Sequence, residues 1–136
     1  MQSEVDQLAI EILRFLAQTG TQVSQLQNIL RQMPALSGIA SFVESRNYGK
    51  DVYLCICLEA DTADQRTLTW WMDIRPVDNG WLINASVLLN GRTAVVELTP
   101  KSVPDFRSVE EQVPLILSKI LEAGTQAIFK PSANRQ

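Results

Sequence analysis

The segment 67–98 constrains the fold most, because its side chains alternate between two faces and its turns are marked. Between residues 67 and 75 every second residue is apolar, as in a β-strand that buries one face. The composition of 76–80 and the Asn90-Gly91 pair both indicate turns. The segment therefore predicts two consecutive β-hairpins. The predicted inner set is Leu68, Trp70, Met72 and Ile74, and the outer set is Thr67, Thr69, Trp71, Asp73 and Arg75.

The two turns also predict a pairing register. Pro76 opposite Trp81 places Asp73 beside Asn84 in the first hairpin, and Leu89 opposite Arg92 places Asn84 beside Glu97 in the second. A polar row of Asp73, Asn84 and Glu97 is then expected on the outer face. Adjacent strands lie about 4.8 Å apart, so the two carboxylates would stand about 10 Å apart. The same register pairs three sets of inner residues, namely Val87 with Ala94, Ala85 with Val96, and Ile83 with Leu98.

The flanking segments show helical periodicity. We expect one helix from Ser3 to a stop at Thr19-Gly20, and a second helix from Thr21 to a stop at Pro34. Strands are expected over 39–46 and 52–59, the second of them apolar on both sides. Ser108 and Glu111 form a capping box for a last helix, which contains Pro114 and which Gly124 closes.

These elements predict one α+β domain over residues 1–129. It has two N-terminal helices, an antiparallel meander of about five strands and one C-terminal helix, with the helices packed mainly on one sheet face. The tail 130–136 is expected to be disordered.

Composition excludes several classes of function. The 136 residues include no histidine, which removes Ser-His-Asp and Cys-His catalysis and His-ligated metal. The formal net charge of −3 argues against nucleic acid and against an anionic membrane as partners. Two strand cysteines, Cys55 and Cys57, point to the same side, and free thiols fit a reducing cytoplasm. No cofactor and no metal site is expected.

The outer face of the predicted sheet has three interpretations. It could be a solvated surface, an interface with a second copy or another protein, or a ligand site. The interface candidates are Trp71, Tyr53, Arg75, Leu82, Leu88 and Val95. The ligand-site candidates are Asp73, Asn84 and Glu97, a carboxylate pair with an amide between them.

The hypothesis that follows is a small, acidic, non-enzymatic interaction protein of the cytoplasm, such as an adaptor, a chaperone-like protein or a neutralising partner. We expect it to form a homodimer or to bind another protein, and its acidic charge favours a basic partner surface. The alternative is a small-molecule-binding domain or an enzyme that uses Asp73, Asn84 and Glu97. A DNA-binding helix-turn-helix over the N-terminal helices is disfavoured, because Arg14 and Arg31 are the basic residues available there.

Overall fold

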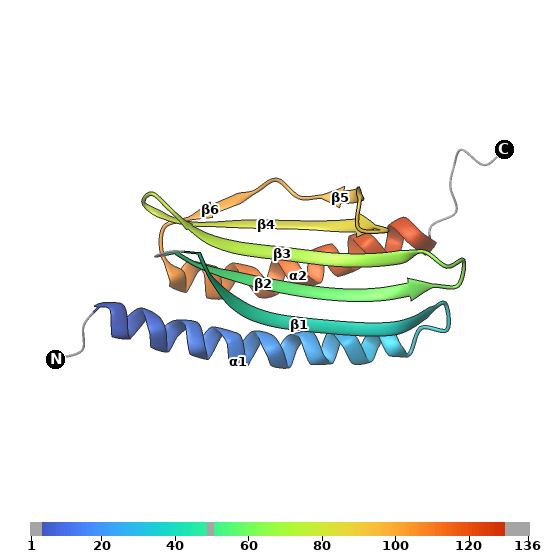
Figure 1. The fold of residues 1–136 in the computed structure, drawn as a ribbon, viewed down its shortest axis with the longest axis horizontal. Coiled ribbons are helices and arrows are strands. Elements are labelled where there is room, and N and C mark those ends of the chain that lie inside the picture. Colours follow the sequence, from blue (N-terminus) through green and yellow to red (C-terminus); the bar gives the residue numbers. More distant parts are fainter. Residues whose placement is uncertain (1–3, 49–50, 130–136) are drawn as a thin grey trace.

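The structure is a computed structural model that describes residues 4–48 and 51–129 (Figure 1). The predicted tail 130–136 lies outside the described residues. The chain order is one long helix, six strands and a second long helix. The elements are α1 (Glu4–Arg31), β1 (Leu36–Tyr48), β2 (Asp51–Thr62), β3 (Thr67–Val77), β4 (Gly80–Leu89), β5 (Thr93–Glu97), β6 (Lys101–Val103) and α2 (Phe106–Phe129).

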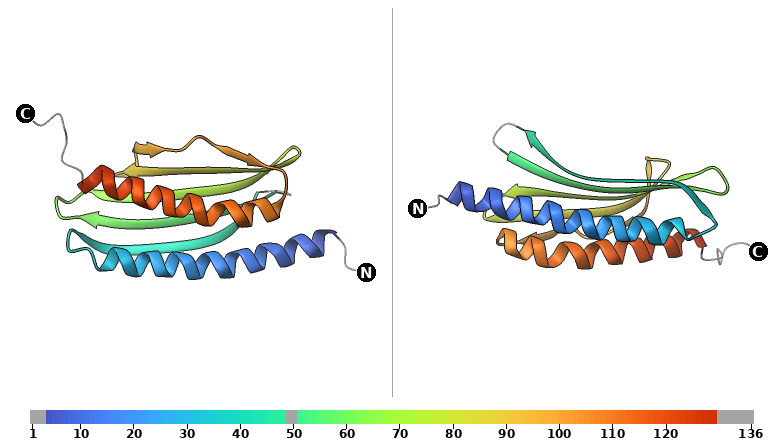
Figure 2. Two further views of the ribbon diagram at one scale, coloured as in Figure 1. Left: turned by 180° about the vertical axis from the view of Figure 1, so that it is seen from behind. Right: turned by 90° about the horizontal axis from the view of Figure 1, so that it is seen from below.

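The strands form one antiparallel sheet in the order β1-β2-β3-β4-β5, and β6 pairs with β4 beyond the end of β5. Both helices lie on the same side of this sheet, α1 along β1 and α2 behind β3 and β4 (Figure 2). The predicted α+β fold with an antiparallel meander is therefore confirmed. We call the helix-covered side the inner face and the opposite side the outer sheet face.

The N-terminal region forms one helix, so the prediction of two helices was wrong. The apolar stripe continues through the expected break, because Phe15, Thr19 and Val23 follow one another at four-residue spacing and all three are buried. The hydroxyl of Thr21 donates to the carbonyl of Ala17 at 3.1 Å, which satisfies that hydroxyl inside the helix. Gly20 costs about 1 kcal/mol relative to alanine, too little to break a helix with a continuous buried face.

The boundaries of α2 also differ from the prediction. Asp105 caps the helix, accepting hydrogen bonds at 2.8 Å from both the backbone N–H and the hydroxyl of Ser108. Ser108 therefore lies inside the first turn instead of capping it. The helix continues past Gly124 to Phe129. Gly124 is buried beneath Trp70, so its missing side chain serves packing and not helix termination.

The first hairpin has the predicted register. Pro76 pairs with Trp81, Asp73 with Asn84 and Trp71 with Ser86. As predicted, Trp70 is buried (1% exposed) within the inner core, whereas Trp71 is half-buried on the outer sheet face. Every second β3 residue from Leu68 to Ile74 is buried, and the residues between them are not.

The second hairpin departs from the prediction, because Leu89 pairs with Thr93 and not with Arg92. Asn90 continues the β3–β4 pairing: its N–H donates to the Thr67 carbonyl at 2.7 Å, and its side-chain oxygen accepts from the Thr67 N–H at 2.9 Å. The link to β5 is therefore one residue longer, which alone would exchange the two faces of β5.

A bulge at Val95 compensates for the longer link. It returns Val96 to the inner face, opposite Val87, although the prediction placed Val96 opposite Ala85. Ala94 was predicted to face inward, but it pairs with Leu88 and so lies on the outer side.

Candidate functional site

The outer sheet face has a central aromatic row formed by β1, β2 and β3. Phe42 pairs with Cys57, and Cys57 pairs with Trp71. The rings of Phe42 and Trp71 meet edge to face, with centroids 6.2 Å apart, so they contact each other across the Cys57 position. Phe42 is 38% exposed and Trp71 is half-buried. An edge-to-face pair of this kind forms a preorganised apolar surface.

The two cysteines point to the same side of β2, as predicted; that side is the outer sheet face, and both thiols are free. They are nevertheless buried, at 5% and 6% exposed, because the larger side chains of neighbouring strands cover them. Burial raises the pKa of the Cys57 thiol to about 11, with Glu59 and Cys55 adding to the effect. Burial also raises the pKa of Cys55. Both thiols stay protonated near neutral pH, which disfavours a nucleophilic or redox role.

Asp73 sits between two donors on the outer sheet face. One carboxylate oxygen accepts from the Trp71 indole N–H at 3.2 Å, and the other accepts from the Asn84 amide at 3.0 Å. The structure thus brings together Trp71, Asp73 and Asn84. These bonds fix the indole ring of Trp71, so Asp73 has a structural role that positions the aromatic row.

Glu97 does not complete the predicted polar row. It pairs with Ser86, which lies in the row of Trp71. This position is two residues along β4 from Asn84. The longer link after Leu89 and the bulge at Val95 each shift the pairing by one residue, and together they cause this displacement. Two strand spacings and a two-residue step separate Glu97 from Asp73, so their Cα atoms are about 12 Å apart. The two carboxylates are exposed or half-buried and do not converge on one point.

The predicted interface residues surround the aromatic row. Arg75 pairs with Leu82 at one end of the face, where Tyr53 pairs with Arg46. Leu88 pairs with Thr69 nearer the other end, and Val95, at the bulge, is 38% exposed.

Two charged residues stand at opposite ends of the outer sheet face. Arg75 is exposed on β3, and Glu59 is exposed on β2 beside Thr69. Neither makes an ion pair within 4–48 and 51–129. Six residues of β3 separate their levels, which corresponds to about 20 Å along the strand.

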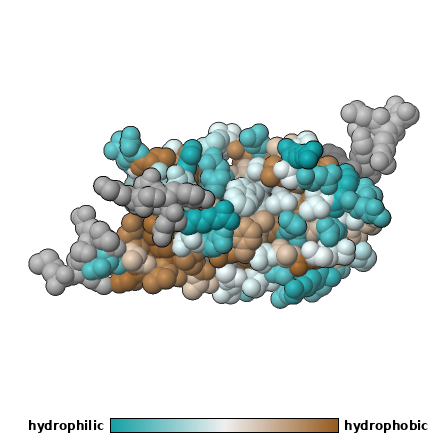
Figure 3. All heavy atoms as spheres, viewed as in Figure 1, coloured by the Kyte–Doolittle hydropathy of each residue, from teal (hydrophilic) through white to brown (hydrophobic). Residues whose placement is uncertain are grey.

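The N-terminal half of α1 carries an exposed apolar patch that the sequence reasoning missed. Ile10 is 44% exposed and Leu13 is 66% exposed. Apolar side chains gather over this part of α1 at the lower left of Figure 3, on the side from which the outer sheet face is seen. The signal available in the sequence was composition. Eight of the ten residues 8–17 are apolar, which exceeds the number that a helix needs to bury one face.

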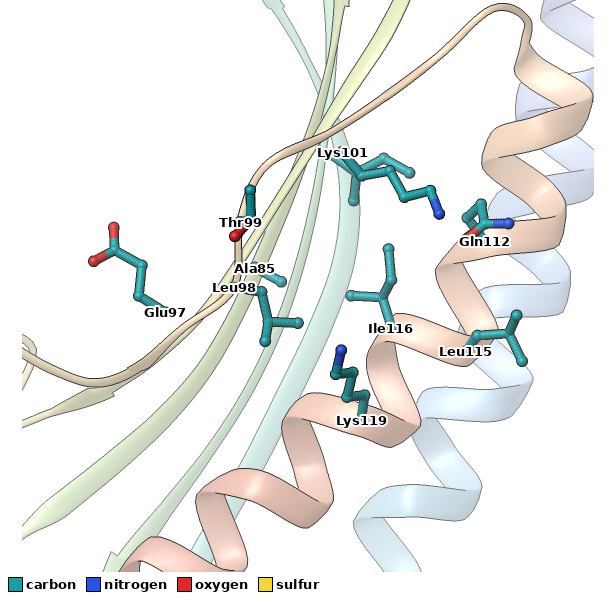
Figure 4. Close-up of a pocket in the computed structure, with 10 residues that line it drawn as sticks. Ala85, Glu97, Leu98, Thr99, Lys101, Gln112, Leu115, Ile116 and Lys119 are labelled. Carbon is teal, nitrogen blue, oxygen red and sulfur yellow. The ribbon is translucent and has the colours of Figure 1, made fainter.

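A cavity of about 440 Å³ lies on the inner side, between α2 and the edge of the sheet. It is lined by β4, the β5–β6 connection and one side of α2, as Figure 4 shows. Two lysines, Lys101 and Lys119, belong to its wall. No motif in the sequence indicated this cavity, because it depends on how α2 crosses the sheet edge.

No protein-family model matches this chain, and comparisons with curated proteins and with solved structures found no match either. Neither α1 nor α2 combines the length and the apolar character that crossing a bilayer requires. Among the described residues, no three acidic or cysteine side chains cluster as metal ligands would.

Proposed function

We propose that this chain is a non-enzymatic protein-interaction domain that pairs with a second copy of itself through the outer sheet face. The observation that carries the proposal is the Phe42–Trp71 aromatic pair, which lies at the centre of a sheet face that neither helix covers. Aromatic residues and arginine are enriched at the centres of protein interfaces, and lysine is depleted there. The face carries both aromatic residues and arginine.

The charge pattern favours a second copy as the occupant. Consider a two-fold axis that lies in the interface and crosses β3 at right angles near Met72. It would bring Arg75 of one copy to the level of Thr69 and Glu59 of the other, because the two ends of the face exchange places. The contact would occur twice, once on each side of the axis. Two cationic and two anionic groups, each without an ion pair in the described residues, would then face each other.

The size of the face is adequate for a moderate dimer. Five strands at about 4.8 Å and eight to nine residues at about 3.3 Å give an area of about 700 Å² per copy. Stable interfaces bury about 800 Å² per partner, so the expected dimer is at the small end of the standard range.

The catalytic alternative, based on Asp73, Asn84 and Glu97, is less well supported. Asp73 already accepts two hydrogen bonds from its own face. Glu97 lies in another row, and a flat sheet face offers no recess that would exclude water from a substrate.

The proposal predicts a dimer that one substitution on the outer sheet face dissociates. Sedimentation equilibrium of the native chain should give twice the monomer mass of 15.2 kDa at concentrations of about 100 µM. Trp71→Asp should sediment as a monomer, because it places a charge at the buried centre of the interface. Circular dichroism would establish that the variant is folded.

Leu13→Asp is the matched control, since it makes the same kind of change in the apolar patch of α1. We expect it to remain a dimer. A native chain that is monomeric at about 100 µM would contradict the proposal. So would a dimer that Leu13→Asp dissociates and Trp71→Asp does not, since that result would assign the interface to α1.

A further inference from the structure

The cavity beside α2 arises from an interruption in the edge of the sheet. Between β5 and β6 the chain runs beside β4, and the Leu98 N–H donates a backbone hydrogen bond to the Ala85 carbonyl at 3.1 Å. Pairing with β4 resumes at Lys101. Pro100 has no N–H to donate, so it cannot take part as a donor in the pairing. The connection therefore arches over the side chains beneath it and leaves a space of about 440 Å³ against α2.

The cavity is apolar on one side and cationic on the other. Ile83, Ala85, Leu98 and Ile116 provide the apolar wall. Figure 4 shows the ammonium group of Lys101, from β6, directed toward Gln112, and that of Lys119, from α2, on the other side of Ile116. Neither lysine makes an ion pair within the described part of the chain.

The one acidic residue in the lining does not neutralise these two charges. Glu97 belongs to the wall, but its carboxylate points away from both lysines (Figure 4). Gln112 adds a polar side chain to the lining, and Thr99 adds a hydroxyl. The cavity thus offers two solvent-exposed cations, hydrogen-bonding groups and an apolar wall within one half-open recess.

We propose that this cavity binds a small organic anion that consists of a carboxylate attached to an apolar body. The carboxylate would lie between Lys101 and Lys119, and the apolar body would pack on Ile83 and Ile116. A cavity of about 150 Å³ holds benzene, so a space three times larger accepts about 15 non-hydrogen atoms. Ligand sites of this kind combine an apolar wall with a few polar groups that fix orientation. The site lies on the inner side, and its lining shares Glu97, at the edge of the sheet, with the outer sheet face.

Three probes test this proposal in an NMR titration of the full chain: 4-phenylbutyrate, its neutral amide 4-phenylbutyramide, and inorganic phosphate. The amide has the same size and shape as the carboxylate and lacks the charge. We expect 4-phenylbutyrate to shift the backbone amide resonances of the non-proline residues within 97–101 and 112–119. It should bind at least about tenfold more tightly than the neutral amide. Phosphate alone should bind more weakly than 4-phenylbutyrate, because it has no apolar body.

The double variant Lys101→Gln/Lys119→Gln should reduce the affinity for 4-phenylbutyrate to that of the amide. Arg107→Gln is the control, since it removes a cation from α2 at a position outside the cavity. It should leave the affinity unchanged. Equal affinities for the carboxylate and the amide would overturn the proposal, as would native affinity in the double lysine variant or shifts confined to other residues. Absence of binding by 4-phenylbutyrate at millimolar concentration would overturn it as well.

Discussion

Trp70→Ala is expected to lower the free energy of unfolding by about 3–5 kcal/mol, whereas Trp71→Ala should lower it by about 1 kcal/mol or less. The two neighbours differ because β3 points successive side chains to opposite faces. Trp70 is 1% exposed and lies between Leu58 and Val87 in the pairing of the sheet. Its removal leaves a large cavity that the surrounding strands and α2 cannot fill.

Trp71 is half-buried and loses a hydrogen bond to Asp73 and a contact with Phe42 when it is truncated. Urea unfolding followed by circular dichroism, at concentrations low enough to keep the chain monomeric, would measure both variants. Trp70→Phe keeps an aromatic ring and provides a milder variant if Trp70→Ala does not fold. A larger loss for Trp71 than for Trp70 would mean that the two faces of the sheet are exchanged.

Gly124→Ala is expected to destabilise the chain by about 1–2 kcal/mol, although alanine is the better helix former. A Cβ atom at this position would lie 2.5 Å from Nε1 of Trp70 and 3.0 Å from a methyl carbon of Val87. Both neighbours are fully buried and cannot move aside without disturbing the core. Overpacking of this kind costs about 1–3 kcal/mol, which exceeds the gain of about 1 kcal/mol in helix propensity.

Gly20→Ala is the matched control, because Gly20 also lies inside a helix and has no atom within 4 Å of an added Cβ. It should stabilise the chain by about 0.5–1 kcal/mol through helix propensity alone. Thermal and urea unfolding of the two variants would give changes of opposite sign. Stabilisation by both substitutions would show that α2 does not pack against Trp70 as described.

The strands of the first hairpin could be predicted from sequence because two independent signals agreed. The alternation from Leu68 to Ile74 defined the faces, and the turn after Pro76 defined the register. In the second hairpin the Asn90-Gly91 turn predicted a two-residue link. The bonds between Asn90 and Thr67 belong to the neighbouring strand, so no local pattern could reveal them. That long-range contact and the bulge at Val95 together moved Glu97 out of the predicted polar row.

In the helices, local sequence signals were present but gave the wrong boundaries. Local signals at Gly20 and Gly124 indicated helix ends, and tertiary packing overrode both of them. Thr19 is polar but only 4% exposed. It therefore continues the buried face of α1 between the apolar residues of the two helices that the sequence predicted. The cavity between α2 and β4 depends on the crossing of elements far apart in the chain, and for that reason its lining showed no sequence pattern.

Charge reversal on the outer sheet face tests the proposed self-association most directly. Arg75→Glu and Glu59→Arg should each weaken the dimer by at least about tenfold in sedimentation equilibrium, because each places like charges opposite each other. The combined variant, Arg75→Glu with Glu59→Arg, should recover most of the native dimer affinity, since the pairing is reversed and restored. Native affinity in both single variants, or no recovery in the combined variant, would contradict a two-fold dimer through this face.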